Sequence, residues 1–302
     1  MKTEPVEPRP PKRDVHGWVV LDKPAGITST HAVSVVRRAF RAKKAGHAGT
    51  LDPLASGVLP IALGEATKTV PYIVDGKKSY RFVVQWGAET DTDDAEGRVT
   101  AESANRPDKT DVEALLPEFS GTIEQIPPRF SAVKIQGERA YDLARDGQEV
   151  DLKPRLVDIE RIALVEHKGE CSVMEVDCGK GTYVRAIARD MGRRLGCYGH
   201  IAALRRTCVG VFDEERAVSV ETVQEKGDET LLPVHAALEG LTMVQVLPAQ
   251  SQRLAQGQPV ILRGRDAPES GAVYAMFGGV LIAVGDVLNG ELHPVRVFNL
   301  PR

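Results

Sequence analysis

The chain has 302 residues, 42% of them hydrophobic and 27% charged, which is enough apolar material for one large domain and a small one. No apolar run approaches the length of a membrane span, and residues 1–13 lack the apolar core of a secretory signal, so we expect a disordered tail there and a cytoplasmic protein. The formal net charge of −3 does not indicate nucleic-acid binding, although phosphate contacts need only a local positive surface.

The first predicted elements are a strand over 17–21 and a helix after it. The sequence GWVVL is an unbroken apolar run, which is typical of a buried strand. Thr28 or Ser29 can cap a helix that runs to about Phe40 with its apolar residues on one face. Five cations lie at and after its end, at positions 37, 38, 41, 43 and 44. They suit a helix carboxyl end and equally suit phosphate contacts, and the sequence leaves both open.

A single carboxylate, Asp52, stands in a loop rich in glycine and proline. Gly46, Gly49 and Gly57 permit positive φ values and close approach of a ligand, and Pro53 restricts Asp52 to extended or turn geometry. The segment therefore suits a carboxylate held on a rigid loop beside open space, where catalytic groups are common. The alternative is an ordinary turn in which Asp52 makes a local hydrogen bond.

The residues around Asp52 resemble the catalytic motif of pseudouridine synthases. The match is with the bacterial tRNA pseudouridine-55 synthase family, TruB, through GHAGT at 46–50, LD at 51–52 and GVL at 57–59. The resemblance implies that Asp52 is the nucleophile of an enzyme that isomerises uridine to pseudouridine at position 55, in the T-loop of tRNA. A uridine inside a folded RNA cannot meet Asp52, so the enzyme would have to flip the base out.

Further along the chain the pattern predicts a strand with one apolar face and then an acidic loop. Apolar residues alternate with other residues over 80–86, and Tyr80 begins this strand. By resemblance Tyr80 is the family's active-site tyrosine, which could stack on the base and help to remove the C5 proton; the alternative is a core tyrosine. Residues 89–96 are rich in acids but lack the spacing of a calcium loop, so we interpret them as a solvated loop.

Residues 106–120 predict a short helix, and residues 121–150 then change in character. The second stretch holds Pro127-Pro128 and several cations, among them Arg129, Lys134, Arg139 and Arg145. It resembles the RNA-gripping insertion of the same family. From its residues alone it is equally well a surface hairpin and helix.

A second strand and helix are predicted over 173–178 and 182–195. The glycine-rich turn between them lacks the Walker pattern, which argues against nucleotide hydrolysis. Arg185 lies on a helix face that otherwise carries small residues, so its side chain has room to reach another element. The resemblance places the family's essential arginine at Arg185, where its planar fork would orient Asp52 and keep it ionised.

The resemblance also implies residues that bind the substrate. Tyr183 and Leu204 would contact the target nucleotide. His47 would fill the space that the flipped nucleotide leaves or contact a phosphate, and Lys23 would support the site from the first strand. We expect no metal site, because the Cys197 and His200 pair has no second pair at suitable spacing.

From about residue 244 the pattern changes to short strands. Strands over 273–277 and 280–284 flank Gly278-Gly279, a strong hairpin signal that indicates an independent β-rich unit. This unit resembles the PUA-type RNA-binding module that ends the family. The expected architecture is α+β: a mixed-sheet catalytic domain over 14–241 with an RNA-gripping insertion at about 121–150, and a PUA-like domain over 244–302.

The chemistry implied by the resemblance needs no cofactor, because isomerisation involves neither net redox change nor hydrolysis. The expected partner is the T-arm of tRNA; no obligatory protein partner is evident, and we expect a monomer. A non-catalytic RNA-binding protein is a second class, against which the set Asp52, Tyr80 and Arg185 argues. A nucleosidase or glycosidase is a third, but glycosidases usually need a second carboxyl group. Attack at C6, attack at C1′ and deprotonation at C2′ all remain open for Asp52.

Overall fold

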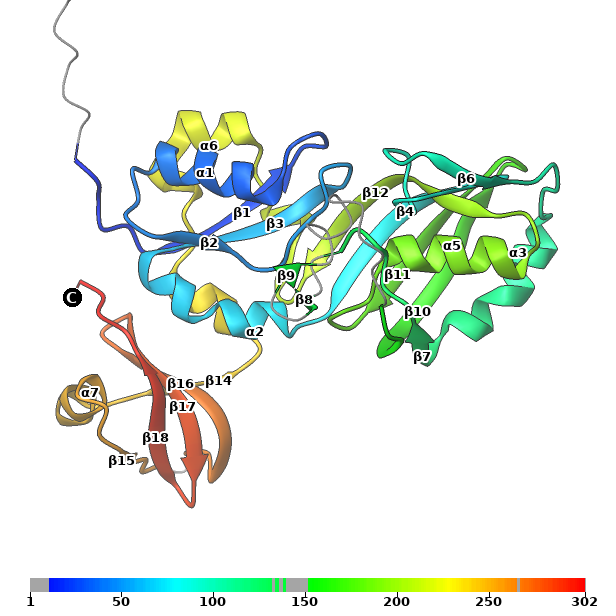
Figure 1. The fold of residues 1–302 in the computed structure, drawn as a ribbon. Coiled ribbons are helices and arrows are strands. Elements are labelled where there is room, and N and C mark those ends of the chain that lie inside the picture. Colours follow the sequence, from blue (N-terminus) through cyan, green and yellow to red (C-terminus); the bar gives the residue numbers. More distant parts are fainter. Residues whose placement is uncertain (1–10, 132–133, 136–137, 140–151, 265–266, 302) are drawn as a thin grey trace, which may run out of the picture.

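The computed structural model describes residues 11–131, 134–135, 138–139, 152–264 and 267–301, and Figure 1 shows how their elements are arranged. A mixed sheet of nine strands carries the larger part of the chain, in the order β1-β3-β12-β4-β11-β10-β7, with β2 beside β3 and β13 beside β12. The predicted α+β class is confirmed. The strands of this sheet are β1 (Gly17–Lys23), β2 (Ala45–His47), β3 (Ser56–Leu63), β4 (Lys78–Trp86), β7 (Gly121–Gln125), β10 (Arg155–His167), β11 (Cys171–Cys178), β12 (Gly199–Val209) and β13 (Phe212–Asp213).

Helices cover this sheet in two places. Near β1 and β3, α1 (Ser29–Ala39) packs beside α6 (Val220–Lys226), whereas α5 (Val184–Arg194) packs on β12 (Figure 1). The Thr28 side chain caps α1 by accepting a hydrogen bond from the His31 N–H, as the sequence predicts for Thr28 or Ser29. The other helices here are α2 (Val70–Val74), α3 (Lys109–Leu115) and the 3₁₀ turns Gly64–Lys68, Leu116–Phe119, Glu214–Arg216, Gly227–Thr230 and Val234–Leu238.

The first five residues of strand β1, 17–21, are apolar because both faces of the strand are buried there. Val19 and Leu21 join the hydrophobic cluster under α1. Trp18 and Val20 point the other way, into a second cluster that also contains residues from the carboxyl end of the chain. The unbroken apolar run in the sequence therefore reflects burial on two sides rather than one.

The last residues form a second sheet in the order β14-β16-β17-β18-β15. Phe277 and Val280 pair across Gly278-Gly279, so the predicted hairpin is confirmed. The sheet begins slightly before the predicted boundary. Its elements are β14 (Thr242–Gln245), α7 (Pro248–Ala255), β15 (Val260–Ile261), β16 (Ser270–Phe277), β17 (Val280–Leu288) and β18 (Glu291–Val297).

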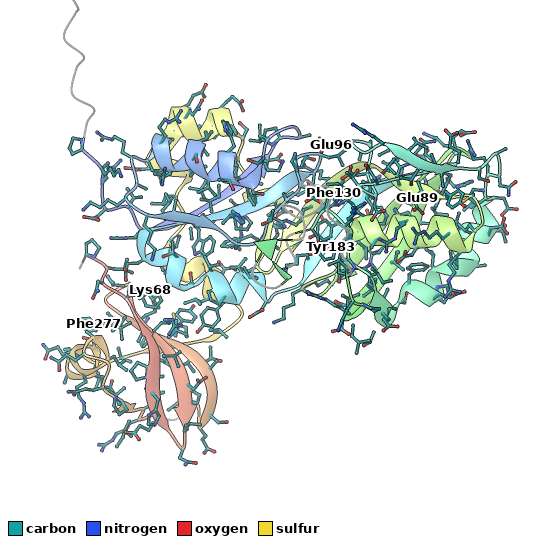
Figure 2. All side chains as sticks on the ribbon, viewed as in Figure 1. Lys68, Glu89, Glu96, Phe130, Tyr183 and Phe277 are labelled. Atoms are coloured by element: carbon teal, nitrogen blue, oxygen red, sulfur yellow. The ribbon has the colours of Figure 1, made fainter. Side chains whose placement is uncertain are left out.

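This carboxyl-terminal sheet has a hydrophobic cluster of its own, which includes Leu254 and Ile282, and it also packs against the first domain. Tyr274 and Met276 share a hydrophobic cluster with Trp18. Polar contacts reinforce the junction: the Lys68 Nζ donates to the Val297 carbonyl at 2.8 Å (Lys68 is labelled in Figure 2), and the Asn299 N–H donates to Glu65 at 2.8 Å. The two units therefore pack together through a common core.

Two predicted boundaries differ from the structure. Arg13, placed in the tail, forms an ion pair with Asp228 at 2.7 Å and backbone hydrogen bonds with Arg41 and Lys43. Residues 1–10 lie outside the described residues. Residues 121–125, placed in the insertion, form β7 and pair with β10 at the edge of the main sheet. Within the insertion, β8 (Lys134–Ile135) pairs with β9 (Glu138–Arg139), and the predicted helix, with Arg145, lies outside the described residues.

Two further small strands, β5 (Ala88–Thr90) and β6 (Val99–Glu102), form a separate ribbon that carries the acidic stretch between them. This ribbon lies close to β12, because the Ala95 N–H donates to the Ile201 carbonyl and the Ile201 N–H donates to the Asp93 carbonyl. The ribbon therefore brings the acidic stretch against the main sheet.

Candidate active site

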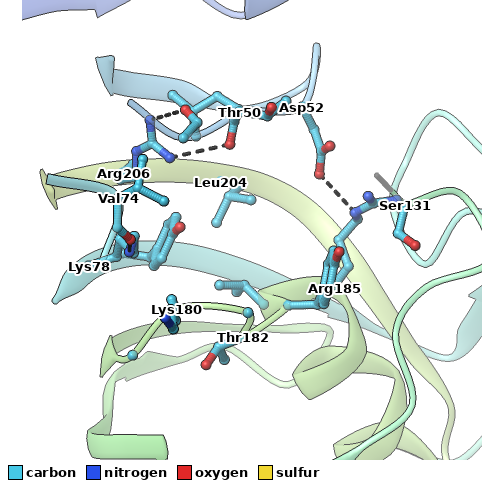
Figure 3. A pocket seen from close by; sticks show the side chains of 17 residues that line it. Thr50, Asp52, Val74, Lys78, Ser131, Lys180, Thr182, Arg185, Leu204 and Arg206 are labelled. Atoms are coloured by element: carbon cyan, nitrogen blue, oxygen red, sulfur yellow. Dashed lines mark hydrogen bonds and ion pairs between the residues drawn. The ribbon is translucent and has the colours of Figure 1, made fainter. Parts of the chain in front are cut away.

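A cavity of about 280 Å³ opens between the Asp52 loop, β4, β12 and the start of α5 (Figure 3). Five of the seven predicted site residues line it. They come from segments that are far apart in the sequence, and the mixed sheet brings them together. These residues are Asp52, Tyr80, Tyr183, Arg185 and Leu204.

The loop that carries Asp52 is fixed by hydrogen bonds on both sides of the carboxylate. The Ser29 hydroxyl donates to the Leu51 carbonyl at 2.9 Å and accepts from the Leu51 N–H at 2.8 Å. After Asp52, the Gly26 N–H donates to the Pro53 carbonyl at 2.8 Å. The Asp52 side chain remains 37% exposed, so a carboxylate on a fixed loop faces open space as the sequence predicts.

Arg185 forms an ion pair with Asp52, with 2.9 Å between Nε and Oδ2 (Figure 3). The rest of its guanidinium is used differently from the expected two-pronged grip on one carboxylate. Nη1 donates to the Thr92 carbonyl at 2.8 Å and Nη2 donates to the Phe130 carbonyl at 2.9 Å. Since the side chain is only 6% exposed, Arg185 presents one nitrogen to Asp52 from an almost completely fixed position.

The acidic stretch at 89–96 is not a solvated loop, so that prediction was wrong. Asp93 and Asp94 are buried, and each faces an arginine of α5: Asp93 pairs with Arg189 at 3.0 Å and Asp94 with Arg185 at 3.5 Å. The two arginines are one helical turn apart and so project from the same side of α5. Burial of these acids is therefore compensated in part by the helix that supplies the partner of Asp52.

Asp93 gives a pH-dependent contribution to stability. Burial raises the pKa of its carboxyl to about 6, against the opposing effect of Arg189. The folded protein thus keeps a proton that the unfolded chain releases between about pH 4 and pH 6. The contribution is fully present below about pH 4, and the free energy of unfolding falls by roughly 3 kcal/mol as the pH rises through the folded pKa.

The prediction is tested with Asp93→Asn, which removes this titration. The free energy of unfolding of the wild type, relative to the variant, should decrease as the pH rises from about 4.5 to about 7.5. Urea unfolding at several pH values measures it. A difference that stays constant or increases with pH would contradict the assignment.

Tyr183 is held in place through its backbone. The Gln125 side chain accepts from the Tyr183 N–H at 2.8 Å and donates to the Tyr183 carbonyl at 3.1 Å, which fixes the residue directly before α5. Burial raises the pKa values of Tyr183 and Tyr80, so both are neutral phenols at neutral pH. Sequence reasoning missed Gln125, because a glutamine at the end of a polar edge strand carries no signal of this role.

Lys23 and His47 are not among the described residues that line the cavity. Lys23 is completely buried, and its ammonium donates to the carbonyls of Pro24 at 2.9 Å and Ile27 at 2.8 Å, with Pro53 at 3.4 Å. Burial lowers the pKa of Lys23 to about 8. Its buried ammonium therefore lies beside Pro53, the residue directly after Asp52. His47 ends β2, where it pairs with Ile61 of β3.

The cavity also has cationic residues that the sequence analysis did not select. Arg206 from β12 lies deep in it, and Lys78 and Lys180 contribute to its lining. Lys180 forms an ion pair with Asp75 at 2.8 Å, and the Lys78 ammonium donates to the carbonyls of Val74 and Gly76. One side of the cavity is thus lined by positive charge.

Among the described residues, no group of three or more histidine, cysteine, aspartate or glutamate side chains is arranged to hold a metal ion. The described residues also include no helix that is both long enough and apolar enough to cross a membrane.

Comparison with known proteins gives consistent matches along the chain. Residues 37–184 match the family described as "TruB family pseudouridylate synthase (N terminal domain)", and residues 185–239 match the "tRNA pseudouridylate synthase B C-terminal domain". Proteins named tRNA pseudouridine synthase B from Rhodopseudomonas palustris and Nitrobacter winogradskyi are each 61% identical over 97% of this chain, covering 84% and 86% of those proteins. A solved Cbf5-Nop10-Gar1 complex contains a chain with a TM-score of 0.71 and 26% identity, over 95% of this chain and 85% of that one.

Proposed function

The chain belongs to the TruB family of pseudouridylate synthases, and from this membership and the geometry of the cavity we propose that it isomerises uridine to pseudouridine at position 55 in the T-loop of tRNA. The ion pair between Asp52 and Arg185, at the edge of a cavity that also contains Tyr80, carries the proposal. The reaction breaks the bond between C1′ and N1 of the uridine and joins C1′ to C5. The C5 proton is lost and N1 gains one, so the product is an isomer and no redox cofactor is consumed.

Asp52 is the group that starts this reaction. Its carboxylate is exposed on one side and held by Arg185 on the other, as a nucleophile or base needs to be. Because Arg185 also donates to two backbone carbonyls, its guanidinium stays in place and orients Asp52 while the carboxylate reacts with the substrate. Attack at C6, attack at C1′ and removal of the C2′ proton all place the same carboxylate beside the nucleoside.

The remaining cavity residues receive the flipped base. Tyr80 offers an aromatic ring for stacking, and Leu204 and Tyr183 bound the space from β12 and from the start of α5. Flipping the base costs a few kcal/mol. We propose that His47, outside the cavity, contacts the RNA that surrounds the target. We also propose that Lys23 holds the Asp52 loop in place through the Pro53 carbonyl.

The rest of the tRNA would contact surfaces outside the cavity. The cations at 37, 38, 41, 43 and 44 are all exposed, and they suit contacts with the phosphates of the T-arm. The insertion and the carboxyl-terminal β-rich unit are the other proposed RNA-binding segments. We propose that the enzyme acts as a monomer in the cytoplasm, with tRNA as its partner.

The electrostatic part of this binding predicts a salt-dependent affinity. Replacing both Arg37 and Arg38 with glutamine should reduce the slope of log K against log salt by roughly 1 to 2, since each lost phosphate contact contributes about 0.7 to 0.9. Replacing Lys109 and Lys168, which are exposed on other parts of the surface, removes the same charge and should leave the slope nearly unchanged. Filter binding of tRNA at several salt concentrations measures both. Equal slopes for the two double variants would reject this surface.

Incubation of the purified protein with an unmodified tRNA transcript tests the function itself. Mass spectrometry and chemical mapping should find pseudouridine at position 55 and no free uracil. A transcript with cytidine at that position serves as the control and should remain unmodified. Release of free uracil would indicate a hydrolase, binding without modification would indicate a non-catalytic RNA-binding protein, and modification at other uridines would reject the T-loop.

A further inference from the structure

Arg206 is a buried cation that the chemistry above does not use. Its side chain lies in β12 with 1% of the residue exposed, and among the described residues it has no carboxylate within ion-pairing distance of 4.0 Å. An unpaired buried charge is costly unless strong hydrogen bonds replace its water. The position of such a residue beside the cavity therefore calls for a structural or functional explanation.

Backbone carbonyls take the place of the missing carboxylate. Nη2 donates to the Gly49 carbonyl at 3.1 Å and Nη1 to the Thr50 carbonyl at 3.3 Å (Figure 3). In addition, Nε donates to the Val58 carbonyl at 2.8 Å. Gly49 and Thr50 lead directly into Asp52, and Val58 lies just after the same loop. One guanidinium thus holds both ends of the segment that carries the proposed nucleophile.

The register of the sheet places Arg206 between this loop and Tyr80. On one side it is the cross-strand partner of Tyr80 in β4, and on the other it is paired with Gly57 in β3. Gly57 has φ +101°, and a Cβ added there would lie 2.2 Å from the Arg206 carbonyl oxygen. The contact between β3 and β12 therefore has no room for a side chain at Gly57, so the register of Arg206 is fixed.

We propose that Arg206 is a positioning residue that fixes the Asp52 loop against the strand that carries Tyr80, so that both side chains face one cavity at a constant separation. This inference rests on the proposed function and adds a residue that acts through Asp52 and Tyr80. Among the described residues, no hydrogen bond joins the Asp52 carboxylate to the Tyr80 phenol. The Arg206 guanidinium, which is bonded to the Asp52 loop from the strand beside Tyr80, therefore sets their relative position.

The same placement acts on the phenol electrostatically. Burial raises the pKa of Tyr80, and Arg206 is the main opposing influence, whereas Cys178 and Asp52 act in the same direction as burial. Burial in turn lowers the pKa of Arg206, and Tyr80 and Asp52 oppose that change. The arginine therefore makes it easier for Tyr80 to give up its own proton, which a role in C5 proton removal requires.

The test compares Arg206 with the neighbouring Arg205, which faces away and forms ion pairs with Asp22 at 3.0 Å and Glu214 at 2.5 Å. In the full-length protein, Arg206→Lys keeps the charge but cannot reach all three carbonyls. Its kcat for tRNA should fall about a hundredfold, with KM within a few-fold of wild type, since misplacement of reacting groups lowers the rate more than binding. The matched Arg205→Lys variant should retain wild-type kcat.

A second readout does not depend on activity. Arg206→Gln removes the charge, so the ionisation midpoint of Tyr80 should move to higher pH, measured as the tyrosinate absorbance lost in the corresponding Tyr80→Phe protein. Wild-type kcat in folded Arg206→Lys, a loss confined to KM, or an unmoved Tyr80 midpoint would overturn the proposal. If Arg206→Gln does not fold, the kcat of Arg206→Lys decides. Wild-type protein that makes no pseudouridine but has a Tyr80 midpoint dependent on Arg206 would reject the proposed function alone.

Discussion

Replacing Asp52 with asparagine is expected to abolish pseudouridine formation while tRNA binding persists. Asparagine has nearly the shape of aspartate, and its amide oxygen can still accept a hydrogen bond from the Nε of Arg185, which lies 2.9 Å from the carboxylate. It is neither a nucleophile nor a base, so each of the three possible first steps fails. The kcat should fall by at least about ten-thousandfold, as for loss of a reacting group in other enzymes.

Single-turnover assays with saturating enzyme measure this effect, and a binding assay with the same tRNA measures affinity. Asp228→Asn is the control, because Asp228 also pairs with an arginine, Arg13, but on the surface. That variant should keep wild-type kcat. Substantial turnover by purified Asp52→Asn would show that the carboxylate does not start the reaction.

Arg185→Lys is expected to lose about a hundredfold to a thousandfold in kcat although the positive charge remains. The guanidinium divides its donors among Asp52, the Thr92 carbonyl and the Phe130 carbonyl. A lysine ammonium that reaches Asp52 leaves both partly buried carbonyls without these donors, at a cost of up to about 1–3 kcal/mol for each group. We therefore expect a lower free energy of unfolding as well as a misplaced Asp52.

Arg193→Lys provides a matched control on the same helix. Arg193 donates two hydrogen bonds to Glu89, at 2.6 and 2.7 Å. Its side chain is 53% exposed, and neither of these bonds involves the Asp52 loop. Its replacement should leave kcat unchanged and lower stability by less than about 1 kcal/mol. Steady-state kinetics and urea unfolding of both variants measure the difference. If Arg185→Lys turned over like wild type, the hydrogen bonds of Arg185 to the Thr92 and Phe130 carbonyls would be irrelevant to the reaction.

Much of the site follows from local sequence, since its signals are local. The glycines and proline around Asp52 predict a fixed, accessible carboxylate, and the small residues beside Arg185 predict an arginine free to reach another element; the ion pair between the two confirms that contact. Alternation over 80–86 predicts β4, and five of the seven selected residues line one cavity. Their roles in the reaction stay predictions.

The interactions that sequence analysis misses are those whose partners lie elsewhere in the chain. Asp93 and Asp94 stand in an acidic stretch whose composition is typical of a solvated loop. Only the structure shows that the two residues are buried against α5, where they pair with arginines. Arg206 is hidden more completely, because its partners are backbone carbonyls, and every residue has one of those. Lys23 was expected to support the site from the first strand, and its contact with the Pro53 carbonyl, which a local pattern cannot show, agrees with such a role.

The order of strands in the main sheet has a consequence for how the chain is made. Strand β4, which carries Tyr80, lies between β11 and β12, and both of these neighbours come much later in the sequence. At about 5 to 20 residues per second, roughly 4 to 17 seconds of synthesis separate the end of β4 from the start of β11. During that interval a strand with large apolar residues has no native partner on either edge, which makes it a template for pairing with other nascent chains. Faster translation between β4 and β11, or a chaperone that covers β4, should therefore raise the yield of folded enzyme.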